Sequence, residues 1–252
     1  MKSSFTSRKM PIHCTVLIPA YNTSKWISEA IYSVFEQKYT NWDILVVDDG
    51  STDNTAREVE YLMPQNDVSL LRLKKNVGVA EATRIGIENA RGPIITILDS
   101  DDKLFPNSLQ DVVPHFERNP LLGFAWSQFK ISNGRVGWSH PLPKGKDLYT
   151  ALTTGWWKAS HQRFFRKESY LKSPGLRGDL TASSDYQLAL LIASTGCKTL
   201  HIPKITYWYR MGRPGCLSRN SQYQRQCVKE MVSWAKRGFP RDHSPHQLSR
   251  AV

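Results

Sequence analysis

Apolar residues in the first hundred positions fall into two kinds of pattern. Short continuous runs rich in β-branched residues have the length of buried strands, and longer stretches repeat apolar positions at helical spacing, as at Ile27, Ala30 and Ile31. The pattern predicts strands over residues 14–19, 44–48, 68–73 and 94–98. It also predicts three helices: one that follows the candidate N-cap Ser24, one that follows the N-cap candidates of residues 51–55, and one over residues 79–90.

Strands and helices that alternate at this spacing form βαβ crossovers, which place parallel strands in one sheet with helices on both faces. Ligands bind such sheets in the crevice beyond the carboxyl ends of the strands. Three loops follow predicted strand ends, at residues 19–22, 48–51 and 99–102, and the last two are rich in carboxylates. The sequence therefore predicts an α/β fold with a Rossmann-like, mostly parallel central sheet, and a ligand site at these loops.

The pattern continues through a helix that follows Pro106 and ends near Arg118 and a strand over residues 121–126, and then it breaks. Residues 132–146 are rich in Gly, Pro, Ser and Lys and predict a loop. Beyond them the elements are mixed, with a helix over 184–195, strands over 198–202 and 207–210, and a last helix over 221–237. We expect one domain with two halves, residues 1–120 and 121–237, and a flexible tail over residues 238–252.

The composition is that of a globular protein. The 252 residues are 40% apolar and 22% charged, and the longest apolar runs fall far short of the roughly 20 residues that a membrane-spanning helix needs. The first eleven residues are polar and basic, unlike a secretory signal. The four cysteines, Cys14, Cys197, Cys216 and Cys227, lack the spacing of a zinc site. We therefore expect a cytoplasmic protein with reduced cysteines.

The net charge of +12 is concentrated in one half of the chain. Residues 1–120 hold 13 Lys and Arg against 16 Asp and Glu, whereas residues 121–252 hold 21 against 6, a balance of +15. Such segregation predicts that the second half docks onto an anionic partner. General solubility is the alternative, although solubility does not require charges to segregate.

Asp99 and Asp101 stand one residue apart where an apolar strand ends. Hard divalent cations prefer carboxylate oxygens, and magnesium takes only one or two of them from protein when phosphates and water complete its shell. The spacing therefore predicts a site for Mn²⁺ or Mg²⁺, whose ligand preferences overlap. The alternative is that Asp101 or Asp102 only caps the helix that follows Pro106.

Four ordered motifs in the first half resemble those of family 2 glycosyltransferases. They are Pro-Ala-Tyr-Asn at 19–22, Val-Asp-Asp-Gly-Ser-Thr-Asp at 47–53, Asn-Val-Gly at 76–78 with Arg84 and Gly86, and Leu-Asp-Ser-Asp-Asp at 98–102 followed by Pro106. Looser matches at 164–166, 184–188, 207–210 and 215–218 extend the resemblance over roughly residues 13–220. The resemblance implies the GT-A fold and an inverting enzyme, with residues 1–120 binding a nucleotide-sugar donor and residues 121–237 binding the acceptor.

The resemblance also assigns roles around the nucleotide. Asp49 would accept a hydrogen bond from the nucleobase imide, which favours a UDP-sugar. Pro19, Ala20 and Tyr21 would frame the base and the ribose. Arg84 would lie near the base and the diphosphate.

In the third loop, the resemblance makes Asp101 the main metal ligand. Asp99 would orient the ribose, or the metal through water, and Ser100 would complete this part of the donor site. The metal would act as a Lewis acid that neutralises charge growing on the leaving diphosphate.

Asp185 matches the catalytic base of the family, which takes a proton from the acceptor in a direct displacement. It begins a predicted helix that Ser183 or Ser184 caps, and a carboxylate there is ionised at neutral pH. The alternative is that Asp185 is only a capping residue, stabilised by the helix dipole. The acidic residue that usually precedes this Asp is Ser184 here, so the base would be less strongly tuned.

Arg210 and residues 213–218 resemble the segment that closes over the diphosphate, because Gly and Pro let a loop fold down and Arg binds phosphate through two hydrogen bonds. The alternative is an ordinary basic surface hairpin. The Gln-x-x-Arg-Trp motif of processive members is absent, since Gln222-Tyr-Gln-Arg225 lacks the tryptophan. We therefore predict transfer of a single sugar.

An aromatic and basic run precedes the proposed base and consists of Trp156, Trp157, Lys158, His161, Arg163 and Arg166. Such a run suits an acceptor, because aromatic faces bind sugars and bases while cations bind phosphate. The alternatives are that the tryptophans belong to the core and that His161 is a polar packing residue.

Three functions fit these features. We favour a metal-dependent transferase that glycosylates a cell-envelope or lipid-linked glycan at the membrane surface, with the basic half resting on anionic lipid. The first alternative is transfer to a hydroxylated base of DNA, with the basic half tracking phosphates. The second is a non-catalytic binding module, which the intact set Asp49, Asp99, Asp101 and Asp185 disfavours.

Overall fold

The computed structural model describes residues 11–65, 67–137, 139–157, 159, 161–180, 183–212 and 221–239. The strands are β1 (Cys14–Ala20), β2 (Trp42–Asp48), β3 (Val68–Arg72), β4 (Ile94–Ile97), β5 (Lys103–Leu104), β6 (Leu122–Ile131), β7 (Val136–Gly137), β8 (Arg163–Arg166) and β9 (Lys198–Tyr209). The helices are α1 (Ile27–Phe35), α2 (Thr55–Leu62), α3 (Val79–Asn89), α4 (Ser108–Arg118), α5 (Leu148–Thr153), α6 (Lys167–Leu171), α7 (Ser184–Ala193) and α8 (Ser221–Lys236), with the short 3₁₀ helix η1 (Met63–Gln65).

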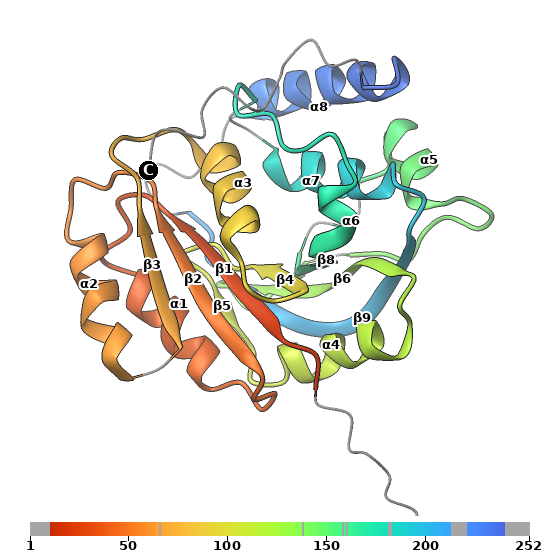
Figure 1. Cartoon of the computed structure of the whole chain (residues 1–252). Helices are drawn as coiled ribbons and strands as arrows, with labels where there is room; N and C mark the ends of the chain where they lie inside the picture. The colour runs from red at the N-terminus through yellow and green to blue at the C-terminus, as the bar shows by residue number, and fades with distance from the viewer. Residues whose placement is uncertain are drawn as a thin grey trace, which may run out of the picture.

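One nine-stranded sheet runs through the centre in the order β3-β2-β1-β4-β8-β6-β9-β5, with β7 paired to β6 (Figure 1). β1 pairs in parallel with β2 and with β4, and β2 pairs in parallel with β3, so these four strands end at the same edge. β8 runs antiparallel between β4 and β6, whereas β6 and β9 are parallel. The predicted α/β fold with a mostly parallel sheet is confirmed, and its mixed part begins at β8.

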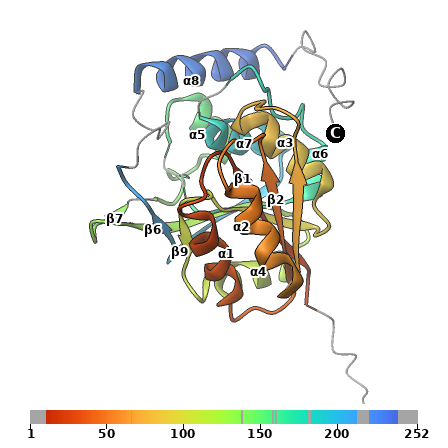
Figure 2. The same cartoon turned by 90° about the vertical axis from the view of Figure 1, so that its left-hand side faces the viewer.

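Helices cover both faces of the sheet. Successive residues of β1 enter opposite layers, since Val16 and Ile18 pack in one apolar cluster and Leu17 packs in the other. The first layer contains α1, α2 and α4, and the second contains α3, α5, α6, α7 and α8 (Figures 1 and 2). Because both faces are buried, the central strands read in sequence as continuous apolar runs rather than as alternating ones.

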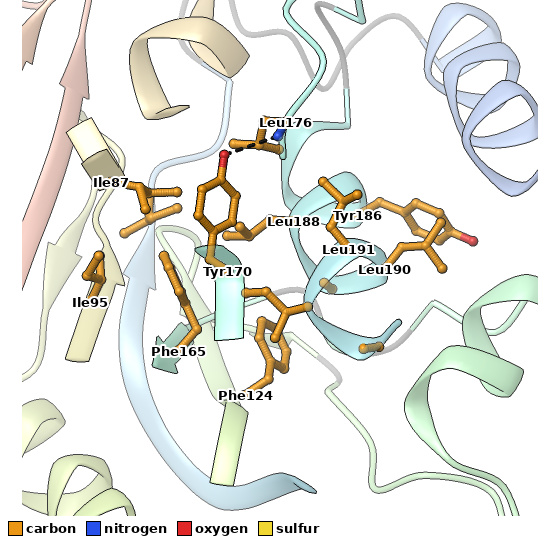
Figure 3. Packing of buried hydrophobic residues seen from close by; sticks show 14 of the residues in the cluster. Ile87, Ile95, Phe124, Phe165, Tyr170, Leu176, Tyr186, Leu188, Leu190 and Leu191 are labelled. Atoms are coloured by element: carbon orange, nitrogen blue, oxygen red, sulfur yellow. Dashed lines mark hydrogen bonds between the residues drawn. The ribbon is translucent and has the colours of Figure 1, made fainter. Parts of the chain in front are cut away.

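Helix α7 is buried along its length, from Tyr186 to Ala193. In Figure 3 its side chains, Leu188 and Leu191 among them, pack toward Tyr170 of α6 and toward Phe124 and Phe165 of the sheet. A helix that is apolar on all sides belongs inside a protein. This packing fixes the first turn of α7, which carries Asp185, relative to the sheet.

The second half departs from the prediction in its strands. The strands predicted over 198–202 and 207–210 are one strand, β9, which stays paired with β6 through register shifts between Trp126 and Gln128 and between Gln128 and Phe129. The sequence pattern also missed β8, because this four-residue strand begins and ends with arginine and Arg163 was interpreted as part of the run that suggested an acceptor surface.

The N-cap predicted for α1, Ser24, is wrong in position, whereas the N-caps of α2 and α7 lie among the predicted candidates. The N-caps of α1, α2 and α7 are Trp26, Asn54 and Ser183, and none makes a side-chain capping bond. The polar residues of the first two helix starts bond across loops instead, since the Ser24 N–H donates to Asp53 Oδ2 at 3.1 Å. These bonds tie the loop after β1 to the loop after β2, where the ligand site was predicted.

Candidate functional site

The acidic residues after β4 form a tight turn at the carboxyl end of the strand. The Leu98 N–H still donates to the Leu17 carbonyl of β1 at 2.9 Å, and the Asp102 N–H closes the turn on the Asp99 carbonyl at 2.9 Å. The Asp99 side chain is 40% exposed, whereas Ser100, Asp101 and Asp102 are buried. The turn therefore holds three carboxylates at the predicted edge of the sheet.

Two hydrogen bonds hold the Asp102 carboxylate, one from β9 and one from the residue that follows β9. The Tyr207 hydroxyl donates to Asp102 Oδ2 at 2.8 Å, and the Arg210 N–H donates to Asp102 Oδ1 at 2.7 Å. Burial, and then the neighbouring Asp99 and Asp101 carboxylates, raise the pKa of Asp102 well above its ordinary value. A divalent cation bound at this turn would reverse that repulsion, because it would be the largest local charge.

His161 brings an imidazole to the same turn. Its Nε2 lies 3.9 Å from Asp99 Oδ2, and one ligand atom each from Asp99, Asp102 and His161 lies within 4.8 Å of the others. The His161 ring packs against Phe129 and Tyr207, with ring centroids 5.1 and 5.0 Å away. Carboxylate oxygens together with one imidazole nitrogen fit a divalent cation.

The sequence placed the metal between Asp99 and Asp101. The structure instead groups ligand atoms of Asp99 with those of Asp102 and His161, and Asp101 is not part of this group. Asp102 was visible in the motif but was interpreted only as a cap. His161 follows about sixty positions later in the sequence, and no spacing rule connects it to the turn. The ring of His161 packs against Phe129 and Tyr207 while its Nε2 faces Asp99, so the residue can be both a packing residue and a metal ligand.

Arg210 lies against the acidic turn. Its Nε donates to the Asp101 carbonyl at 2.7 Å, and its Nη2 donates to Glu29 Oε2 at 3.0 Å. The guanidinium also lies over the Trp208 ring, 4.8 Å from the centroid. These contacts hold the Arg210 guanidinium beside the acidic turn. The adjoining loop predicted over 213–218 lies outside the described residues.

The second carboxylate loop follows β2. Asp49 is buried and accepts the Val77 N–H at Oδ1, 2.7 Å away, and the Gly78 N–H at Oδ2, 2.9 Å away. Burial raises the pKa of Asp49, and the two N–H bonds oppose that shift. The Asp49 N–H also donates to the Ala20 carbonyl at 2.8 Å. Each carboxylate oxygen keeps a second lone pair, so a nucleobase N–H can still bond there.

The loop after β1 lies beside this one. Ala20 is buried, Pro19 is half-buried and Tyr21 is 43% exposed, which leaves the tyrosine ring available to a ligand. Asn22 Oδ1 accepts the Thr52 N–H at 2.9 Å and so joins the two loops. The structure therefore brings Pro19, Ala20 and Tyr21 together with Asp49, as the predicted nucleotide site requires.

Arg84 lies within α3 with its guanidinium already held by carboxylates. Its Nη2 is 2.6 Å from Glu81 Oε1, and its Nη1 is 2.5 Å from Glu88 Oε1. The hydrogen bond to Glu81 raises the pKa of Arg84 against the opposing effect of burial. In this structure Arg84 stabilises α3, and none of these contacts points to a diphosphate.

Asp185 lies in the first turn of α7, with its side chain 29% exposed. Its Oδ2 is 3.5 Å from Nη1 of Arg163, whose side chain is 4% exposed. The Tyr186 N–H donates to Asp185 Oδ1 at 2.8 Å. Arg163 therefore contacts the proposed base, and His161, two residues earlier, contacts Asp99. The acidic turn and the proposed base meet across the start of β8.

The two tryptophans of the predicted acceptor run pack against the core. Trp156 meets Trp126 edge to face with centroids 6.3 Å apart, and Trp157 meets Tyr186 at 5.0 Å. Both side chains are only partly buried and border the apolar cluster around α7. Lys158 lies outside the described residues.

The model of the family described as glycosyl transferase family 2 matches residues 15–175, which include the β1, β2 and β4 loops and β8. The chain belongs to this family. Chondroitin synthase from Escherichia coli is 27% identical over 212 residues, which cover 81% of this chain and 29% of that protein. Glycosyltransferase GlyG from Streptococcus pneumoniae is 39% identical over 97 residues, which cover 38% of this chain and 32% of that protein. The chain thus spans about a third of the length of these curated relatives.

Solved structures of glycosyltransferases share the fold. TarS of S. aureus superposes with a TM-score of 0.69 at 18% identity, over 88% of this chain and 39% of that one. The mannosyltransferase PcManGT from Pyrobaculum calidifontis, in complex with GDP-Man and Mn²⁺, also gives 0.69, at 20% identity over 91% of this chain and 65% of that one. These likenesses confirm the GT-A fold. Among the described residues, no helix combines the length and the apolar character that crossing a membrane requires.

Proposed function

We propose that this protein is a metal-dependent, inverting glycosyltransferase that moves one sugar from a UDP-sugar to a hydroxyl of a cell-envelope or lipid-linked glycan. Membership of the family supports sugar transfer. The observation that carries the finer proposal is the meeting of two features at one edge of the sheet. A metal-ligand cluster of Asp99, Asp102 and His161 includes a residue just before β8, and Asp185 contacts Arg163, the first residue of β8.

Donor binding follows from the two loops beside β1 and β2. Asp49, Ala20 and Tyr21 suit the uridine, and a structure of TarS in complex with UDP-GlcNAc supports this choice of nucleotide. Arg210 offers a cation to the diphosphate. A divalent ion at the acidic turn, to which Asp101 also belongs, would neutralise charge on the leaving diphosphate, and the Mn²⁺ complex of PcManGT supports such an ion.

The transfer step needs one base. Asp185 takes the proton of the acceptor hydroxyl as the acceptor oxygen bonds to the anomeric carbon. The bond from that carbon to the phosphate oxygen breaks, and its electron pair leaves with the nucleoside diphosphate. A single displacement inverts the anomeric centre. The position of Asp185, 29% exposed at the start of a buried helix, suits a group that must meet an incoming acceptor.

The choice of acceptor is supported by relatives and by charge. Curated relatives include the chondroitin synthase of E. coli and the hyaluronan synthase of Pasteurella multocida, whose names denote polysaccharide synthesis. The balance of +15 in residues 121–252 favours an anionic surface. We therefore place the enzyme at the cytoplasmic face of the membrane, where anionic lipid attracts basic segments.

A thermal-shift screen of UDP-sugars with and without Mn²⁺ tests donor binding, because a ligand that binds only the folded state raises its stability. We expect one UDP-sugar to raise Tm only when Mn²⁺ is present. Asp101→Ala should lose Mn²⁺-dependent hydrolysis of that sugar, and Asp67→Ala on the exposed turn before β3 is the matched control. Unchanged hydrolysis in Asp101→Ala would remove Asp101 as a metal ligand. Donor binding without any turnover in the wild type would favour a non-catalytic module.

Asp185→Asn should bind the same UDP-sugar and fail to transfer it, whereas full transfer would remove Asp185 as the base. The acceptor class is tested by two binding assays on the wild type. Sedimentation with anionic liposomes supports the glycan proposal. Retardation of duplex DNA that falls steeply with salt, without liposome binding, would replace it with transfer to DNA.

A further inference from the structure

A buried arginine faces the proposed base, and the established reaction class gives it no role. We infer that Arg163 is a positioning residue, which holds the Asp185 carboxylate in one orientation and affects sugar transfer only through that carboxylate. The inference rests on the proposed role of Asp185 as base. It reassigns Arg163, which the sequence had placed on an acceptor surface, because its buried guanidinium lies 3.5 Å from Asp185 Oδ2.

The backbone that carries Arg163 is held by buried hydrogen bonds. The Arg163 carbonyl accepts the Thr96 hydroxyl of β4 at 2.8 Å, and the preceding residue, Gln162, donates to that same hydroxyl oxygen at 2.6 Å. The Gln162 N–H donates to Ser127 Oγ of β6 at 3.0 Å. Networks of this kind, when satisfied and buried, fix one arrangement of the strands. The guanidinium therefore starts from a rigid point in the sheet.

The Asp185 carboxylate is held at both oxygens. Oδ2 lies 3.5 Å from Arg163 Nη1, and Oδ1 accepts the Tyr186 N–H at 2.8 Å. Without Arg163, one oxygen would remain anchored, and the side chain would be free to sample other staggered rotamers. A general base must lie within about 3 Å of the proton that it takes, and a displacement of about 1 Å can slow a reaction about 100-fold.

Arg163 takes no part in the bond changes. Asp185 gains the hydroxyl proton, the acceptor oxygen gains the glycosyl bond, and the nucleoside diphosphate leaves with the electron pair of the broken bond. Arg163 keeps its protons and its charge throughout. Its removal should therefore lower kcat and leave donor KM unchanged, because the donor loops lie on β1, β2 and β4.

The test uses the UDP-sugar that gives the largest thermal shift, with Mn²⁺ and with water as acceptor, and measures UDP release. Arg163→Gln should lower kcat by about 100-fold with donor KM within about twofold, and Arg163→Lys, which keeps a cation at the site, should recover part of the rate. The matched control is Arg166→Gln at the other end of β8, where the guanidinium bonds the Leu122 carbonyl at 3.2 Å and the Phe116 carbonyl at 3.0 Å. Per folded molecule, that control should keep its kcat.

A double-mutant cycle distinguishes positioning from a general loss of structure. If Arg163 acts through Asp185, the variant with both Arg163→Gln and Asp185→Asn is as slow as Asp185→Asn alone. Multiplied losses, or a full rate in Arg163→Gln beside an inactive Asp185→Asn, would overturn the role of Arg163 and leave the proposed function standing. A full rate in Asp185→Asn would overturn the base itself. Should Arg163→Gln fail to fold, Arg163→Lys completes the same cycle.

Discussion

Tyr207→Phe removes one hydroxyl that joins β9 to the acidic turn. Tyr207 is fully buried, and its hydroxyl donates to Asp102 Oδ2 at 2.8 Å and accepts the Asp99 N–H at 3.2 Å. Burial, and then the Asp102 and Asp99 carboxylates, raise the pKa of Tyr207 well above its ordinary value, so the hydroxyl stays protonated and remains a donor. Phenylalanine keeps the ring in place, so the change removes hydrogen bonds without opening a large cavity.

The cost follows from what each partner loses. A hydrogen bond to a charged group contributes about 1.5–3 kcal/mol, and one between neutral groups contributes about 1 kcal/mol. Asp102 keeps the Arg210 N–H at 2.7 Å, and the partly buried Asp99 N–H can be hydrated, so the two losses do not add fully. We expect the free energy of unfolding to fall by about 2–3 kcal/mol. Tyr186→Phe is the control, because its hydroxyl donates only to the neutral Leu152 carbonyl, at 2.8 Å, and should cost about 1 kcal/mol.

Urea denaturation near pH 7 measures both variants, and an unchanged slope of free energy against urea shows that the folded state is still compact. We also expect Tyr207→Phe to weaken Mn²⁺ binding, measured by titration, because the hydroxyl holds both Asp99 and Asp102. Tyr186→Phe should leave Mn²⁺ binding unchanged. A loss of stability in Tyr207→Phe no larger than in Tyr186→Phe, or unchanged Mn²⁺ binding, would refute this account of the turn.

Two further predictions concern stability. In Gly86→Ala the new Cβ would lie 2.3 Å from Leu17 Cδ1, so overpacking of about 1–3 kcal/mol should outweigh the helix preference of about 1 kcal/mol for alanine; a higher urea midpoint would contradict this. Asp147→Ala removes the cap of α5, which accepts the Thr150 N–H at 2.7 Å, and should cost about 1 kcal/mol at neutral pH. That N–H bond lowers the pKa of Asp147 below the ordinary 3.8, so the cap contributes above that value and its contribution is lost as the pH falls through the lowered pKa. A difference between wild type and variant that persists in strong acid would show that the charge is irrelevant.

The donor half of the site could be predicted because its determinants are local. Each of the loops at 19–22, 48–51 and 99–102 directly follows a continuous apolar strand, and parallel strands bring their carboxyl ends to one edge without further information. Asp99 and Asp101 lie in the same turn because they are only two positions apart in the sequence. Arg84 is the exception, since the sequence suggested a place near the diphosphate and the structure pairs it within α3. Its partners Glu81 and Glu88 stand three and four positions away on the same helix face.

The rest of the site depends on where β8 pairs. Antiparallel pairing of β8 with β4 sets Phe164 opposite Thr96, and this register carries His161 toward Asp99 and Arg163 toward Asp185. Buried bonds from Thr96 and Ser127 support the pairing, and none of these contacts leaves a periodic signal in a four-residue strand. The sequence therefore suggested which side chains were unusual and could not show what each one contacts.

Some of the basic residues in the second half make contacts inside the protein and are not available to an anionic partner. Arg166 bonds the Phe116 carbonyl near the end of α4, and Lys167 bonds the Ala90 carbonyl at 2.7 Å beyond the end of α3, so both cations serve helix ends. Together with Arg163, they account for part of the balance of +15 without offering charge to a partner. Attraction to an anionic surface must then come from exposed cations such as Lys146 and Lys229. Salt screens exposed charges strongly and buried ion pairs much less. Binding to liposomes or DNA should therefore weaken as salt is added, whereas the ion pair of Arg163 with Asp185 should be little affected.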